Sequence, residues 1–108
     1  MITVEQARAI LLEMPVVEEG TNNGNPDFRV KNKMFATFPR GFIFVNLRVG
    51  DEEVAILISQ RRVFSIPEVN ARGGWVSVKL AAITEEEFVQ VAWKAWRYTA
   101  PPRISLQY

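Results

Sequence analysis

Three stretches of the chain carry hydrophobic residues at the spacing of a helix. The first and the last each begin with a capping box, Thr-x-x-Gln from Thr3 and Thr-x-x-Glu from Thr84. The middle stretch is short, and Asp51 stands where its side chain can cap the first turn. Pro15 and Pro101 follow the first and the last stretch, and proline stops a helix. The pattern therefore predicts helices over residues 3–14, about two turns from residue 51, and 84–99.

Between these helices, apolar and polar residues alternate with the period of a strand. The clearest example lies in residues 42–49, where Val45 and Leu47 share one face while Phe44 and Arg48 share the other. Glycine, asparagine and proline separate the alternating runs, and these residues favour turns. We predict five strands, over residues 28–31, 34–38, 42–49, 63–66 and 75–80, with turns at Asn32-Lys33, 39–41 and 70–74 and an irregular turn over 18–27.

The predicted order is one helix, three strands, a second helix, two strands and a last helix. Hairpin-length connections dominate the first half of the chain, which favours an antiparallel sheet over a parallel one. We therefore expect a two-layer α+β fold, in which an antiparallel five-stranded sheet has its helices on one face. The 108 residues contain no repeat or linker, so residues 1–108 are expected to form a single domain.

Composition excludes several classes of function. The chain contains no cysteine and no histidine, which removes disulfides, thiolate metal sites and every catalytic arrangement that depends on imidazole. No recognisable catalytic motif is present among the carboxylates, lysines, serines and tyrosines that remain. No apolar run approaches the roughly 20 residues that span a bilayer, and no secretory signal is visible. We expect a cytoplasmic protein that is not an enzyme and has no metal, no cofactor and no membrane partner.

Charge is sorted along the chain although the formal net charge is only +1. Residues 1–27 carry one arginine against five acids, whereas residues 28–50 carry five bases and no acid. The bases of the predicted strands alternate with core positions, so they should face away from the helices. Aromatic residues should join them on that face. The predicted outer face is basic and aromatic, and it contains Arg29, Lys31, Arg48 and Lys79 with Phe42, Phe44 and Trp75.

This combination suits single-stranded nucleic acid, because rings stack on bases while cations neutralise phosphates. The nucleic-acid hypothesis names Arg29, Lys31, Lys33, Arg48 and Lys79 as phosphate contacts. A second hypothesis is a protein-interaction or chaperone-like adaptor, or a homodimer, that uses Phe42, Phe44 and Trp75 on the same face. A purely structural explanation also stays open, because outward strand positions are commonly polar and a loop, the tail or a second subunit could cover the rings.

Two further groups of residues have ordinary structural explanations. Glu18, Glu19 and Asp27 surround a turn, but their spacing does not match a calcium loop, so we expect solvated charges. Trp93 and Trp96 lie three residues apart on the last helix, which predicts packing against the sheet. Arg97 follows Trp93 by four residues and is placed for a cation–π contact with its ring.

Several short motifs resemble those of the MmcQ/YjbR family of small bacterial proteins. They are Gly20-Thr21, Gly24-x-Pro26-x-Phe28-Arg29-Val30, Lys33-x-Phe35-Ala36, Gly74-Trp75-x-x-Val78-x-Leu80 and Ala95-Trp96-Arg97-x-x-Ala100-Pro101. The resemblance implies a YjbR-like two-layer fold with a secretion-chaperone-like or frataxin-like arrangement. It also implies DNA binding, because family members commonly carry that label for their double-wing likeness. The chain departs from the family at three positions. It has Asn25 where many relatives have a histidine before the proline that matches Pro26, and Gly73 where many have a histidine near the Gly-Trp. It has Pro102 where the family often has lysine.

Overall fold

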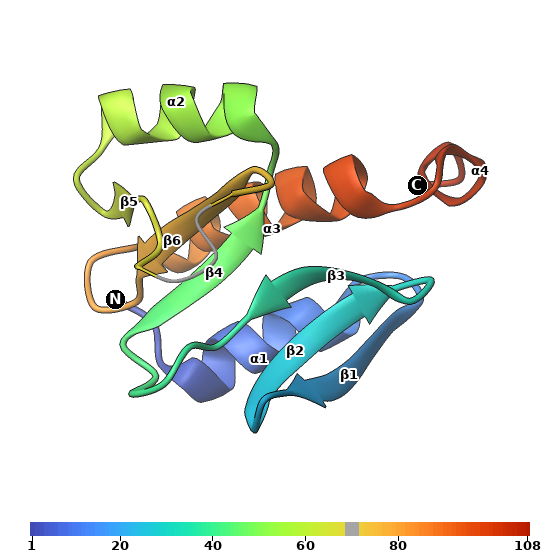
Figure 1. Cartoon of the computed structure of the whole chain (residues 1–108), viewed down its shortest axis with the longest axis horizontal. Coiled ribbons are helices and arrows are strands. Elements are labelled where there is room, and N and C mark those ends of the chain that lie inside the picture. Colours follow the sequence, from blue (N-terminus) through green and yellow to red (C-terminus); the bar gives the residue numbers. More distant parts are fainter. Residues whose placement is uncertain (69–71) are drawn as a thin grey trace.

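The computed structural model describes residues 1–68 and 72–108. One six-stranded antiparallel sheet, in the order β1-β2-β3-β4-β6-β5, forms a layer that helices cover from behind in the view of Figure 1. The strands are β1 (Val17–Asn22), β2 (Asn25–Val30), β3 (Lys33–Thr37), β4 (Phe44–Arg48), β5 (Phe64–Ser65) and β6 (Trp75–Lys79). The helices are α1 (Val4–Glu13), α2 (Asp51–Gln60), α3 (Glu85–Thr99) and the short α4 (Pro102–Ser105).

The α+β class and the antiparallel sheet are confirmed, but the prediction of five strands is wrong. The irregular turn predicted over 18–27 is mostly strand: β1 begins at Val17 and pairs with β2 in unbroken register from Val17↔Val30 to Asn22↔Asn25. Asn23 and Gly24 make the two-residue turn between the strands, both with positive φ, and Asn-Gly favours this hairpin turn. Gly20, Asn22, Asn25 and Pro26, which also suggested a loop, lie in the paired strands.

Three predicted boundaries are corrected as well. The turn between β2 and β3 consists of Lys31 and Asn32, both with positive φ, so Lys33 is already the first residue of β3. β4 begins at Phe44, because Phe42 adopts a positive φ that a strand does not accept. The cap of α2 is Gly50, and Asp51 is the first helical residue. Of the predicted turn at 70–74, Asn70 and Ala71 lie outside the described residues.

α1 and α3 begin and end as their capping signals predict. Thr3 and Thr84 both form complete capping boxes, and α3 ends at Thr99 before the two prolines. α1 packs on β1, and α3 packs on β3 and β4. α2 contacts β5 and β6 and lies beside α3, to which it is joined by an ion pair between Lys94 Nζ and Glu53 Oε2 at 2.8 Å.

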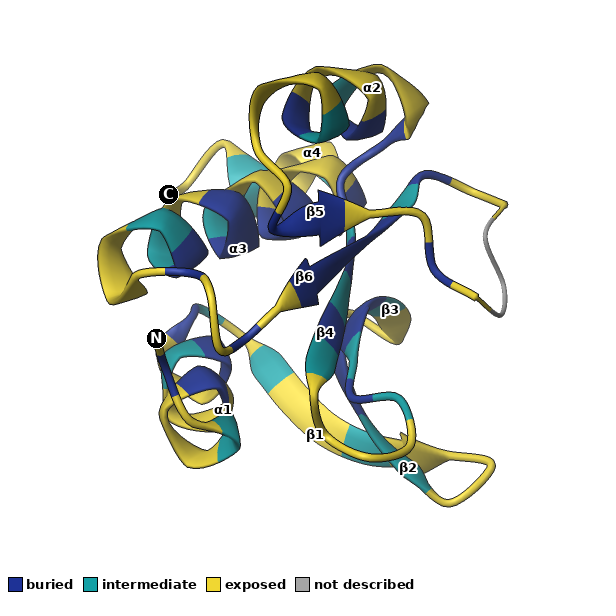
Figure 2. Cartoon of the chain, turned by 90° about the vertical axis from the view of Figure 1, so that its left-hand side faces the viewer, coloured by how far each residue is buried: buried dark blue, intermediate teal, exposed yellow. Residues whose placement is uncertain are grey.

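The core lies between α1, α3 and the sheet, as the buried residues in Figure 2 indicate. Trp96 is fully buried and its indole N–H donates to the Pro15 carbonyl oxygen at 3.0 Å, so this ring fixes the end of α1 against α3. The Arg97 guanidinium lies 5.2 Å from the centre of the Trp93 ring, which confirms the predicted cation–π contact. The Ala-Trp-Arg motif is therefore explained by helix packing.

Candidate nucleic-acid interface

The open face of the sheet carries a row of small and polar residues that crosses all six strands. Directly opposed residues of antiparallel strands point to the same face, so the pairing register defines this row. The polar row consists of Gly20, Asp27, Thr37, Asn46, Ser77 and Ser65, in spatial order. The residues adjacent to this row on β2, β3, β4 and β6 form a second, buried row that faces the helices, which consists of Phe28, Ala36, Leu47 and Val76.

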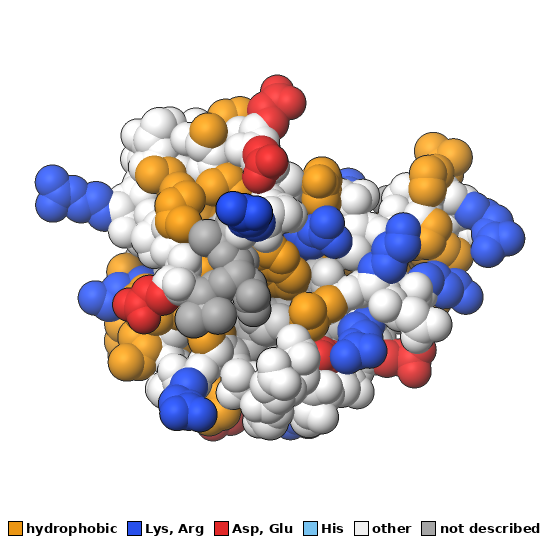
Figure 3. Space-filling model, in the orientation of Figure 1, with side chains coloured by type: hydrophobic (Ala, Val, Ile, Leu, Met, Phe, Trp, Pro, Cys, Tyr) orange, Lys and Arg blue, Asp and Glu red, His pale blue; other side chains and the backbone are white. Residues whose placement is uncertain are grey.

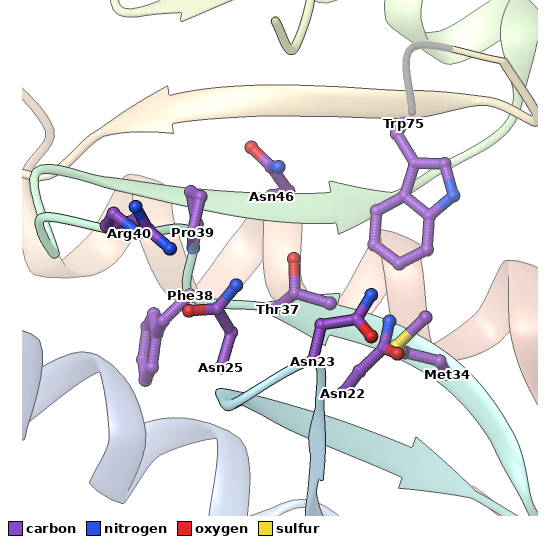
Figure 4. Close-up of a pocket in the computed structure, with 10 residues that line it drawn as sticks. All are labelled: Asn22, Asn23, Asn25, Met34, Thr37, Phe38, Pro39, Arg40, Asn46 and Trp75. Carbon is purple, nitrogen blue, oxygen red and sulfur yellow. The ribbon is translucent and has the colours of Figure 1, made fainter. Parts of the chain in front are cut away.

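A cavity of about 350 Å³ opens on this face (Figure 4). Its floor is formed by strand residues such as Thr37 and Asn46, and the β1–β2 hairpin turn bounds one side. Trp75 stands at one end and Arg40 at the other. Asn46 Oδ1 is buried and has no hydrogen-bond partner among the described residues. The lining comprises Asn22, Asn23, Asn25, Met34, Thr37, Phe38, Pro39, Arg40, Asn46 and Trp75.

The basic residues of this face are divided between two ends of the sheet. The β2–β3 turn, the end of β4 and the start of β6 lie at the same end, because β4 runs antiparallel to both β3 and β6. This end therefore holds Arg29, Lys31 and Arg48 together with Trp75, whereas Lys79 lies at the opposite end beside Phe44. In Figure 3 most Lys and Arg side chains of this view gather on the right, where Figure 1 places the β2–β3 turn and α4.

Arg29 is held by an acid that sequence reasoning treated as a solvated charge. Asp27 is fully buried, and its two carboxylate oxygens accept hydrogen bonds from Arg29 Nε and Nη2, both at 3.0 Å. The hydrogen bond to Asp27, with the attraction of its charge, raises the pKa of Arg29 above its ordinary value. Gly20 leaves room for this pair, since a Cβ there would lie 3.1 Å from Asp27 Oδ1. The expectation that Asp27 is solvated is therefore wrong.

Arg48 and Trp75 are opposed residues at the basic end of the sheet. The Arg48 Nε–H donates to the Gly73 carbonyl oxygen at 2.9 Å, and the guanidinium lies 5.8 Å from the centre of the Tyr98 ring. These contacts fix the side chain while leaving it partly exposed. Neither of these partners is an acid, so neither neutralises the positive charge of Arg48.

The Gly74-Trp75 motif is explained by a close approach of two backbones. A Cβ on Gly74 would lie 2.5 Å from the Gly50 Cα, and Gly74 has a φ of +82°. The Gly74 carbonyl oxygen accepts hydrogen bonds from the N–H groups of Val49 (2.9 Å) and Gly50 (3.0 Å). Only glycine fits these constraints at residue 74. The motif therefore ties the start of β6 to the end of β4 and places Trp75 at the cavity.

The three lysines named from the sequence are all exposed, but they occupy different places. Lys31 lies in the β2–β3 turn. Lys33 is opposed to Val30, whose side chain is fully buried in the core, so the register directs Lys33 to the side of the helices. Lys79 is opposed to Phe44 at the far end. Lys31 thus lies at the same end of the sheet as Arg29 and Arg48, whereas Lys33 is directed to the helices and Lys79 lies at the other end.

The predicted aromatic residues do not form one patch. Phe42 is 50% exposed in the loop before β4, and its ring makes an edge-to-face contact with Phe38 at 6.3 Å between centroids. Phe44 is partly buried and lies at the same end of the sheet as Phe42. Trp75 is partly buried at the other end. Trp75 is the one of the three that lines the cavity.

Sequence reasoning missed the amides of the cavity. Asn22, Asn23 and Asn25 were assigned to a turn. Alternation along residues 42–49 puts Asn46 on the face of Phe44 and Arg48, between the buried residues Val45 and Leu47, but no role in a site was predicted for it. The hairpin asparagines could not be placed without β1.

The described residues show no arrangement for a metal ion. Within 1–68 and 72–108, no three Asp, Glu, His or Cys side chains are grouped closely enough to hold one. Glu19 accepts a hydrogen bond from Arg8 Nε at 2.8 Å and is engaged in that ion pair. Among the described helices, none has both the length and the apolar character required to cross a membrane.

Comparison with known proteins gives one result. The family model described as YjbR matches residues 12–98, which include every strand of the sheet, the cavity and most of α3. No curated protein matches the chain.

Proposed function

The chain belongs to the YjbR family, and we propose that it is a non-enzymatic module that binds single-stranded DNA on the open face of its sheet. The observation that supports this proposal is the composition of that face. An aromatic ring, Trp75, stands at one end of an amide-lined cavity and Arg40 at the other. Arg48 is opposed to Trp75, and Lys31 lies in the β2–β3 turn at the same end of the sheet. Proteins that bind single strands combine stacking rings with flanking cations in this way.

Phosphate contacts are proposed first for Lys31 and Arg48. Lys31 is exposed at the tip of a hairpin, and Arg48 is partly exposed and has no acidic partner in the part of the chain that the structure describes. Arg29 contributes less, because its guanidinium already neutralises the buried Asp27, although 41% of its side chain is exposed. Lys33 and Lys79 are proposed as outer contacts, since they lie beyond the cavity or toward the helices.

The cavity favours binding over catalysis. Among the described residues its lining consists of amides, a hydroxyl, apolar side chains and Arg40, with no carboxylate. General acid–base catalysis uses a carboxylate, imidazole, amine, phenol or thiol within reach of the substrate. The carboxamides of the lining instead donate and accept hydrogen bonds, which suits binding.

Salt-dependent binding of DNA tests this proposal. Labelled eight-nucleotide single strands and the matched duplex are titrated with the protein at two salt concentrations. If about four phosphates are engaged, log K should fall with log salt at a slope of about −2.8 on the single strand. The variant Lys31→Glu should bind several-fold more weakly. Arg62→Glu is the matched control, because Arg62 is also exposed but lies between α2 and β5, away from the β2–β3 turn (Figure 1).

The proposal fails if the wild-type protein binds neither DNA form at low salt. It also fails if Lys31→Glu and Arg62→Glu weaken binding equally, since the effect would then come from net charge alone. Stronger binding to the duplex than to the single strand would replace the proposed ligand with double-stranded DNA.

A protein-interaction or chaperone-like adaptor is the second candidate. The observation that favours it is the apolar pair Phe42 and Ile43, which are 50% and 56% exposed in the loop before β4. A self-associating adaptor should lose its dimer in Phe44→Asp, measured by size-exclusion chromatography with light scattering. A monomer in both forms excludes the homodimer.

A further inference from the structure

We infer that the cavity between Trp75 and Arg40 is a base-binding site that accepts one unstacked nucleobase of the bound strand. This inference rests on the proposed function and specifies how the strand is held. Its volume of about 350 Å³ is within the range of small-molecule sites, which begins at roughly 300 Å³. One base with its sugar is a ligand of that size class.

The lining matches the edge of a base in its hydrogen-bonding groups. Four carboxamides face the cavity, three from the β1–β2 hairpin and one from Asn46 on β4. Each carboxamide offers a donor and an acceptor side by side, and base edges carry the same pair of groups. Asn46 Oδ1 is buried and has no hydrogen-bond partner among the described residues, and a buried acceptor without a partner costs free energy that a ligand N–H reaching this carboxamide would recover.

Trp75 provides the flat wall that a base requires. Its ring stands at the end of the cavity in Figure 4, across from Arg40 and Pro39. The Gly74–Gly50 contact fixes the backbone from which the Trp75 ring projects. Stacking on this ring then costs side-chain conformational entropy and no backbone rearrangement at residue 75.

The charges of the lining distinguish a base from other ligands. A free phosphate would be expected to meet several cations, but among the described residues of the lining Arg40 alone is charged. An apolar ligand would leave the carboxamides unpaired, at a cost for each buried group. A neutral, planar ligand with mixed donors and acceptors satisfies the amides and Trp75 together, while Arg40 at the margin is placed for the neighbouring phosphate.

An abasic strand tests the inference, because it keeps the phosphates and removes the bases. The affinities of an eight-nucleotide DNA and of an abasic strand of equal length are compared at one low salt concentration. The wild-type protein should bind the normal strand about tenfold more tightly. That preference should be lost in Trp75→Leu and reduced severalfold in Asn46→Ala. Ser65→Ala, which changes the same polar row outside the cavity, should keep it.

The possible results separate the two claims. Equal binding of both strands by the wild-type protein overturns the base-binding site and leaves phosphate-mediated DNA binding intact. A preference that survives unchanged in both Trp75→Leu and Asn46→Ala also overturns the site, because the bases would then be read elsewhere. Binding of neither strand overturns the proposed function itself. Thermal unfolding of each variant confirms that it is folded at the temperature of the titration.

Discussion

Leu47 and Asn46 are neighbours on β4, yet they belong to different parts of the molecule. Leu47 is fully buried under α3, in a row that continues with Ala36 and Val76 on the adjacent strands. Asn46 lies on the open face and lines the cavity, and its buried Oδ1 has no hydrogen-bond partner among the described residues. The helix-covered face uses its residues for stability, whereas the open face keeps polar groups that packing does not require.

The difference shows how a small domain can separate folding from binding. Burial of the inner row removes apolar surface from water, which is the main source of stability. The outer row contributes little to that burial, so its residues are available for ligand contacts at small cost to the fold. Substitutions on the two faces should therefore affect different measurements.

The largest expected effect is the difference in free energy of unfolding between two alanine variants at adjacent residues of β4. Leu47→Ala should lower the free energy of unfolding by about 4 kcal/mol, because it leaves a cavity in a closely packed core. Asn46→Ala should lower it by less than about 1 kcal/mol and should weaken binding of single-stranded DNA. Denaturant unfolding and DNA titration measure the two properties. Equal losses of stability would show that the two faces are not distinct.

A smaller effect is expected for the ion pair between Asp27 and Arg29 on the open face. Arg29→Met should lower the free energy of unfolding, because it leaves the buried Asp27 carboxylate without its partner. Asp27→Asn should lower it less, since the partly exposed Arg29 can still be solvated. Urea unfolding at neutral pH compares the two variants. A larger cost for Asp27→Asn would contradict this account of the pair.

The smallest effect on stability is expected at the hairpin tip. Lys31→Gly should leave the protein as stable as before or stabilise it by up to about 1 kcal/mol, because glycine accepts the positive φ of this turn. The same change removes one proposed phosphate contact, so the salt slope on single-stranded DNA should shrink by about 0.7. Thermal unfolding measures the stability of Lys31→Gly, and titration with single-stranded DNA at several salt concentrations measures the slope. An unchanged slope would remove Lys31 from the interface.

Much of the fold was predictable because local signals agreed with the final packing. The two capping boxes and the alternation around Val45 and Leu47 led to correct helices and a correct buried face. β1 was missed because Glu18, Glu19 and Gly20 have low strand propensity, and their strand exists only through pairing with β2. Such pairing is a tertiary effect that a local pattern does not contain.

The candidate site was predictable only in part. Alternation placed Trp75 and Arg48 on the open face and placed the residues next to them in each strand in the core. It did not reveal that Asp27 neutralises Arg29, although the two lie two positions apart and so share a face of the strand. The division of the cations between two ends depends on the strand order, and the strand order is set by long-range contacts.

The central claim is that single-stranded DNA binds on the open face, with one base in the cavity. Titration of ¹⁵N-labelled protein with an eight-nucleotide single strand, followed by NMR, tests it most directly. The account predicts that the indole N–H of Trp75 and the side-chain amide of Asn46 shift most, while the indole N–H of the buried Trp96 stays unchanged. Shifts confined to α1, α2 and α3, or no shifts at low salt, would contradict it.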